Sequence, residues 1–124
     1  MKTIITGSAG FIGFHLAKKL ADQGKDLILI DNFNRGEMDK SFKELINRNN
    51  VQFFDLDLTQ SNSLKNINGD ISKLYHLAAI NGTENFYNIP EKVLKVNILT
   101  TLNILDWAIE KPNIKILYSS SSTL

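Results

Sequence analysis

A glycine-rich turn between an apolar strand and a helix constrains the fold of this chain most. Residues 2–6 are β-branched and apolar, which predicts a buried strand, and the segment "GSAGFIG" follows at once. We expect Gly7 to end the strand, Gly10 to begin a helix, and Gly13 to let that helix pack closely on the strand. The amides of the turn would then face outward unpaired, at the positive end of the helix dipole, where a pyrophosphate fits.

An ordinary tight loop would also explain these glycines, so the next strand matters. The spacing is G-x-x-G-x-x-G, with Ala9 where the common dinucleotide fingerprint has its middle glycine. The apolar run "DLILI" ends at Asp31, about 20 residues downstream, where a carboxylate can accept bonds from the adenosine ribose hydroxyls. Such a carboxylate repels a 2′-phosphate and favours NAD over NADP, although Arg35 is close enough in sequence to reach a phosphate. Asp31 as a mere turn former before Asn32 is the alternative.

Strand and helix patterns alternate along the whole chain. The expected strands cover 2–6, 26–31, 51–58, 71–79 and 114–122, and the expected helices cover 11–23, 37–48, 60–67 and 90–111. Gly24 closes the first helix, and Thr59 is expected to cap the third. This order predicts an α/β fold, a Rossmann-like doubly wound parallel sheet of about five strands in three layers, over one domain of residues 1–124. Ligands would bind at the carboxyl ends of the strands.

Composition excludes several functions. The net charge is +1, with basic and acidic residues interleaved, which argues against a nucleic-acid partner. Cysteine is absent and the two histidines, His15 and His76, are not at ligand spacing, so no metal site is expected. We expect His15 to be solvated and His76 to be packed and hydrogen-bonded. The amino-terminal apolar run is too short for a signal peptide or a membrane span, which favours the cytoplasm and no membrane partner.

Six segments together resemble a known family. "TGSAGFIG", "DNFNRG", "DLDL", "YHLAA", "VNILTTLNIL" and "ILYSSSSTL" occur in the order and spacing of the extended short-chain dehydrogenase/reductases, the NAD-dependent nucleotide-sugar epimerase and dehydratase family. The resemblance covers the whole chain and implies NAD as cofactor and a nucleotide sugar as substrate. It also implies a homodimer through paired long helices, here residues 90–110, part of whose apolar surface we expect to be exposed.

The resemblance further implies which residues surround the cofactor. Asn97 would hold the loop after the fourth strand, unless it is a helix asparagine that bonds a neighbouring loop with no ligand nearby. The other implied contacts are Phe11 and Ile12 under the pyrophosphate, Asp31, Asn32 and Arg35 around the adenosine ribose, Asp57 and Leu58 beside the adenine, and Leu77, Ala78 and Ala79 toward the nicotinamide ribose.

The serine run after the last strand bears on catalysis. The resemblance implies that Ser121 is the substrate-facing hydroxyl, beside a tyrosine that acts as acid and base; a polar strand exit is the alternative. Ser122 and Thr123 stand where the dehydratase branch has acidic residues, which favours an epimerase or a reductase.

The sequence holds no Y-x-x-x-K segment, so the tyrosine and lysine of the family are not among these residues. We therefore expect the NAD-binding portion of an enzyme that works by transient hydride transfer, inactive by itself and without a substrate-binding lobe. The alternative is a non-catalytic dinucleotide-binding sensor or a vestigial module.

Overall fold

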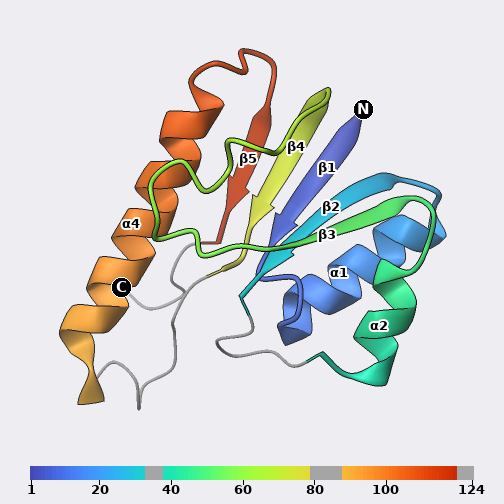
Figure 1. The fold of residues 1–124 in the computed structure, drawn as a ribbon, viewed down its shortest axis with the longest axis horizontal. Coiled ribbons are helices and arrows are strands. Elements are labelled where there is room, and N and C mark those ends of the chain that lie inside the picture. The colour runs from blue at the N-terminus through green and yellow to red at the C-terminus, as the bar shows by residue number, and fades with distance from the viewer. Residues whose placement is uncertain (33–37, 79–87, 120–124) are drawn as a thin grey trace.

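A five-stranded parallel sheet organises the fold in the computed structural model, which describes residues 1–32, 38–78 and 88–119 (Figure 1). Neighbouring strands follow the order β3-β2-β1-β4-β5, and all four pairings are parallel. The strands are β1 (Lys2–Thr6), β2 (Asp26–Asp31), β3 (Val51–Asp55), β4 (Ile71–His76) and β5 (Lys115–Tyr118), and the helices are α1 (Phe11–Asp22), α2 (Lys40–Ile46) and α4 (Pro90–Ala108). The predicted fold class is confirmed.

Two apolar cores lie on opposite faces of the sheet. Successive side chains of a strand point to opposite faces, so Ile4 joins one core and Ile5 the other. Helices α1 and α2 cover the Ile5 face, whereas α4 and the segment between β3 and β4 cover the Ile4 face (Figure 1). The three layers of a doubly wound fold follow from this arrangement.

The strand order reverses at β1. From β1 the chain builds outward through β2 and β3, then returns to place β4 on the other side of β1 and β5 beyond it. Thr6, the last residue of β1, therefore pairs with Ile30 on one side and with His76 on the other. The carboxyl ends of β1 and β4 form the switch point at which such sheets bind ligands.

Several expected elements are shorter than the sequence pattern indicated, and one is wrong. The helix expected over 60–67 is a series of turns, in which amides bond three residues back and Asn62 has a φ of +60°. Leu58, Leu64 and Ile67 are buried in the core from this irregular segment. The helix expected over 37–48 covers only Lys40–Ile46, since the Asp39 carboxylate caps it by accepting the Phe42 amide at 2.8 Å.

Three expected strands also end early. The last residues of β3, β4 and β5 are Asp55, His76 and Tyr118, where the patterns extended to residues 58, 79 and 122. Residues 56–58 after β3 and residues 77–78 after β4 are not part of a strand.

Candidate functional site

Two of the glycines in and after the loop that follows β1 are packed against backbone so tightly that neither has room for a Cβ. Gly7 has a φ of +71°, and a Cβ there would lie 2.8 Å from the amide nitrogen of Ala78. A Cβ on Gly13 would lie 2.2 Å from the carbonyl oxygen of Gly7. The close approach predicted for Gly13 is therefore present, but its partner is the loop more than the strand. Gly10 differs, since a Cβ there meets only the Gly7 oxygen, at 3.3 Å.

The expectation that the amides of this turn are unpaired is wrong. Gly7 and Ser8 donate to the Ile30 carbonyl at 2.9 and 3.3 Å, and the Gly10 amide donates to Gly7 at 3.1 Å. The Ala9 amide donates to Oδ2 of Asp31 at 2.8 Å. The loop is thus held by internal bonds and presents a fixed backbone.

The amides left open are one turn further on, in α1. Gly10 is the N-cap, and Phe14 is the first residue to bond back to it, at 2.9 Å. Among the described residues, the amides of Phe11, Ile12 and Gly13 have no acceptor. Phe11 and Ile12 are exposed on this positive helix terminus, whereas Gly13 is buried. The site can therefore hold an anion on backbone amides.

Asp31 stands where the sequence predicted it, at the end of β2 beside the loop. Its side chain is buried, and its bond to Ala9 joins the second strand to the glycine loop. Sequence reasoning assigned the carboxylate to a ligand and missed this structural bond. Asn32 is exposed next to it, whereas Arg35 lies outside the described residues. The ribose contacts remain predictions.

On the far side of β2, the two residues expected beside an adenine differ in exposure. The Asp57 carboxylate is exposed and accepts the amide and hydroxyl of Thr59 at 3.0 and 2.6 Å, and the hydroxyl bond is the main cause that lowers the pKa of Asp57. Asp57, not Thr59, therefore acts as the capping residue of this turn. Leu58 is buried in the core, and its carbonyl accepts a bond from Asn103 at 2.8 Å. Because its side chain is buried, Leu58 can contact a ligand only through its backbone.

A hydrogen-bonded junction lies at the end of β4. Oγ1 of Thr6 accepts the amides of Leu77 and Ala78 at 2.9 and 3.0 Å and contacts Nδ1 of His76 at 2.8 Å. His76 is packed and hydrogen-bonded as expected, and burial lowers its pKa to about 4. Sequence reasoning missed Thr6, although a threonine at the end of a buried apolar strand is a polar group that needs partners.

Three predicted positions are not settled by these contacts. Ala79 and Ser121 lie outside the described residues. Asn97 lies half-buried on α4, where its carbonyl accepts the hydroxyls of Thr100 and Thr101 at 3.2 and 2.9 Å. Its predicted role in holding the loop after β4 stays a prediction.

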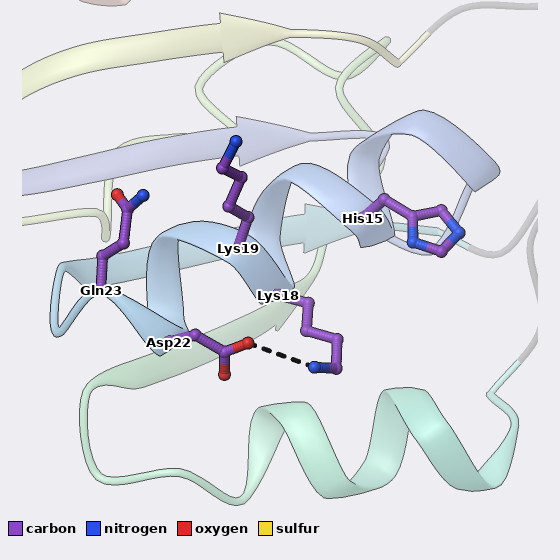
Figure 2. Close-up of a pocket in the computed structure, with 5 residues that line it drawn as sticks. All are labelled: His15, Lys18, Lys19, Asp22 and Gln23. Carbon is purple, nitrogen blue, oxygen red and sulfur yellow. Dashed lines mark hydrogen bonds and ion pairs between the residues drawn. The ribbon is translucent and has the colours of Figure 1, made fainter.

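A shallow hollow of about 310 Å³ lies along α1 on the outer side of the fold. It is lined by His15, Lys18, Lys19, Asp22 and Gln23 (Figure 2). Lys18 is held by Asp22 at 3.2 Å, whereas Lys19 points away from that pair (Figure 2). His15 is exposed, as expected. The residues of this hollow do not include the glycine loop, and we assign no ligand to it.

Two classes of site find no support in the part of the chain that the structure describes. No group of three or more potential metal ligands comes together there. No helix within it has the length and apolar character needed to cross a membrane.

The fold and the glycine loop together define a dinucleotide-binding domain of the Rossmann type. Residues 3–124 match the model of the NAD dependent epimerase/dehydratase family, and the chain belongs to that family. The resemblance seen in the sequence and the expectation of NAD as the cofactor are confirmed at the level of the family.

Two similar curated proteins are named as decarboxylases of UDP-linked sugar acids. A UDP-N-acetyl-alpha-D-glucosaminuronate decarboxylase of Bacillus cytotoxicus is 32% identical over 121 residues, which cover 98% of this chain and 36% of the relative. UDP-glucuronic acid decarboxylase 1 of Danio rerio is 31% identical, with 98% and 27% covered.

Solved structures of epimerases share the fold. UDP-glucose 4-epimerase of Thermotoga maritima, solved with UDP-glucose, has a TM-score of 0.84 at 29% identity, over 98% of this chain and 38% of that one. The Thermus thermophilus UDP-glucose 4-epimerase, solved with NAD, has a TM-score of 0.81 at 26% identity, with the same coverage. The chain thus spans about a third of the length of these proteins.

Proposed function

We propose that residues 1–124 are the NAD-binding portion of a nucleotide-sugar epimerase or a related reductase. The observation that carries this proposal is the open first turn of α1, which places the amides of Phe11, Ile12 and Gly13 at the switch point of the sheet. Gly7 and Gly13 leave no room for a Cβ against neighbouring backbone, so the loop is held in one shape where it leads into that turn. The structure therefore fits the cofactor of the family.

Different residues at this end of the sheet would hold different parts of NAD. The helix amides bind the pyrophosphate, the Asp31 carboxylate accepts the ribose hydroxyls beside Asn32 and Arg35, and Asp57 meets the exocyclic amine of the adenine. Leu77, Ala78 and Ala79 line the path to the nicotinamide ribose, next to the loop held by Asn97. NAD itself would supply a carbon that takes a hydride from the sugar and returns it.

The substrate proposal is a UDP-linked sugar. UDP-sugars appear in the names of the similar decarboxylases and also in the names of the epimerases of similar fold. Ser121 would form a hydrogen bond with the sugar oxygen that gains or loses a proton. The tyrosine that acts as acid and base beside it belongs to the Y-x-x-x-K segment, which is not among residues 1–124. We propose that the 124 residues bind NAD without turning over a sugar nucleotide. Turnover of UDP-glucose to UDP-galactose by residues 1–124 alone would contradict this.

The central test is calorimetric titration of the chain with NAD and NADP. We expect NAD to bind and NADP to bind more weakly, because Asp31 repels a 2′-phosphate. Gly10→Val should abolish binding while the fold persists, since its Cβ meets only the Gly7 oxygen of the described structure, at 3.3 Å, and we expect its methyl groups to occupy the space of the pyrophosphate. Lys19→Ala, on the outer side of α1, is the matched control and should bind normally.

Asp31 calls for two variants because it also holds the loop. Asp31→Ala removes both the Ala9 bond and the ribose acceptor, and should weaken NAD binding by about tenfold or more. Asp31→Asn retains an oxygen for the Ala9 amide but loses the charge, so the preference for NAD over NADP should shrink. Equal or tighter binding of NADP by the unaltered chain would overturn the assignment of Asp31.

A sensor or vestigial module that binds NAD without catalysis is the second candidate. It is favoured only by the missing Y-x-x-x-K segment. The coding sequence on either side of these residues decides between the two, because an enzyme needs that tyrosine and lysine in the same polypeptide.

We also propose that α4 pairs with α4 of a second copy. Leu94, Ile98, Leu102, Leu105 and Ile109 form an exposed apolar stripe along it, between 46% and 78% exposed. Ile98→Glu should shift the sedimentation of the chain from dimer to monomer, whereas Lys95→Glu, beside the stripe, should not. An unaltered chain that is monomeric at every concentration tested would refute the pairing. The cytoplasm remains our proposed compartment, because a sequence without cysteine suits a reducing environment.

A further inference from the structure

The hydroxyl of Thr6 has all of its hydrogen-bonding capacity in use. A threonine hydroxyl can donate one bond and accept two. Both accepted bonds come from backbone amides, those of Leu77 and Ala78, at 2.9 and 3.0 Å. The remaining contact, to Nδ1 of His76 at 2.8 Å, must therefore be the one that the hydroxyl donates. Nδ1 is thus an acceptor and carries no proton.

The other imidazole nitrogen agrees with this assignment. A neutral imidazole without a proton on Nδ1 carries it on Nε2, which lies 3.4 Å from Oγ1 of Thr101. Thr101 donates its own proton to the carbonyl of Asn97 at 2.9 Å, so its oxygen is available to accept from Nε2. The donated bonds therefore run in one direction, from Thr6 of β1 through His76 of β4 to Thr101 and Asn97 of α4.

The surroundings of the imidazole keep it neutral. Thr6 is completely buried and His76 is 3% exposed. Thr6 of β1, Thr101 of α4 and the ring of Tyr118 of β5, 5.8 Å away, are the described groups that face it, and Tyr118 is the one titratable group among them. A second proton, on Nδ1, would have no lone pair of Thr6 to bind unless an amide of residue 77 or 78 gave up its bond.

This junction touches the glycine loop directly. A Cβ on Gly7 would lie 2.8 Å from the nitrogen of Ala78 and 2.9 Å from the oxygen of Leu77. The backbone of Leu77 and Ala78, which Thr6 holds, is therefore in close contact with Gly7. A displacement of this backbone would change the conformation of the glycine loop that leads into the first turn of α1.

We propose that His76 is a positioning residue that acts through Thr6. Neutral, with its proton on Nε2, it accepts the Thr6 hydroxyl proton and so turns the Thr6 lone pairs toward the amides of Leu77 and Ala78. Thr6 thereby fixes this backbone against the glycine loop. The junction would order the cofactor site before any ligand arrives. Its effect on NAD rests on the proposed function, whereas the proton arrangement and the order of the loop do not.

The first experiment reads the proton directly. The variant His15→Gln leaves His76 as the single imidazole of the chain. At neutral pH, ¹⁵N NMR should show Nδ1 as an unprotonated nitrogen and Nε2 as a protonated one. A proton on Nδ1 would overturn the proposal. In Thr6→Val, which loses the hydroxyl but keeps the shape, this tautomer preference should disappear and the amides of Leu77 and Ala78 should exchange with solvent at least tenfold faster.

The second experiment compares Thr6→Val with Thr6→Ser, which restores the hydroxyl. We expect Thr6→Ser to bind NAD within about threefold of the unaltered chain and Thr6→Val to bind about tenfold more weakly or worse. Equal affinity of the two variants would refute the positioning role. If the unaltered chain does not bind NAD, the proposed function fails, and the tautomer and amide exchange still decide the junction. If Thr6→Val does not fold, the tautomer of the His15→Gln chain decides it.

Discussion

Helices α1 and α4 lie on opposite faces of the same sheet but use their surfaces in different ways (Figure 1). Over its 12 residues, α1 buries Gly13, Ala17 and Ala21, small residues at a spacing of four that bring its backbone close to the strands. Over its 19 residues, α4 buries only Thr100 and Ile104. The five large apolar residues that made α4 recognisable as a helix are all exposed.

The difference separates two functions of the fold. Close packing of α1 fixes the helix terminus on which we place the pyrophosphate. The α4 helix contacts the sheet through a narrow line of residues and holds its larger apolar surface outward, where a second copy could cover it. An apolar stripe thus identifies a helix without telling which of its faces meets the sheet.

The largest effect should come from adding a side chain where α1 packs against the glycine loop. Gly13→Ala places a methyl group 2.2 Å from the Gly7 oxygen and 2.9 Å from its carbonyl carbon, both in backbone that cannot move aside. Helix propensity alone would favour alanine by about 1 kcal/mol, but the clash should outweigh it and cost more than about 3 kcal/mol of unfolding free energy. Urea denaturation measures this. If the variant is as stable as the unaltered chain, α1 is not packed as tightly as described.

The next effect tests the two faces of α4 against each other. Ile104 is 1% exposed in the core, and Ile104→Ala should cost about 3 kcal/mol through lost burial and a cavity. Leu102 is 50% exposed, and Leu102→Ala should change the stability of the monomer by less than about 1 kcal/mol. Both are read by urea denaturation below the concentration of any dimer. Equal costs would mean that α4 is rotated about its axis.

A third effect concerns pH, and it belongs to the junction between β4 and α4. The folded pKa of His76 is about 4, below the usual histidine value of 6.5, so the unfolded chain binds the proton more readily. The contribution of neutral His76 to the stability of the fold is therefore complete above pH 6.5 and is lost as the pH falls toward 4. The free energy of unfolding should drop by roughly 1.5 kcal/mol between pH 6.5 and 5. His76→Gln should flatten this part of the stability curve. Asp57 and Asp22, whose pKa values are lowered from 3.8, contribute only in more acidic solution. An unchanged slope in His76→Gln would show that another group titrates.

The first half of the fold was predictable because its signals are local. The apolar runs of β1 and β2 and the glycine that closes α1, the left-handed Gly24, all fall within short windows of sequence. The helix expected at 60–67 failed because its polar residues carry no periodic pattern, and tertiary contacts of Leu64 and Ile67 determine the turns there. Propensity alone does not decide such a segment.

The site divides in the same way. Spacing in the sequence placed Gly7, Gly13 and Asp31, and the structure brings all three to one end of the sheet. Two bonds that shape the site were not predictable, from Ala9 to Asp31 and from Thr6 to His76, since they join residues 22 and 70 positions apart. Those bonds depend on which strands become neighbours, and strand order is a property of the whole sheet.

The smallest effect compares how the two helices end. Gly24 follows α1 with a φ of +79°, and a Cβ there would have nothing within 4 Å, so Gly24→Ala should cost about 1 kcal/mol from backbone conformation alone. The C-cap of α4, Ile109, keeps a helical φ of −54° and is 78% exposed, so Ile109→Ala should change the stability by less than about 0.5 kcal/mol. Thermal unfolding of both variants measures the difference. Only α1 of these two helices is followed by a residue in the left-handed conformation. If Ile109→Ala cost as much stability as Gly24→Ala, the cost would come from side-chain contacts at the helix ends and not from backbone conformation.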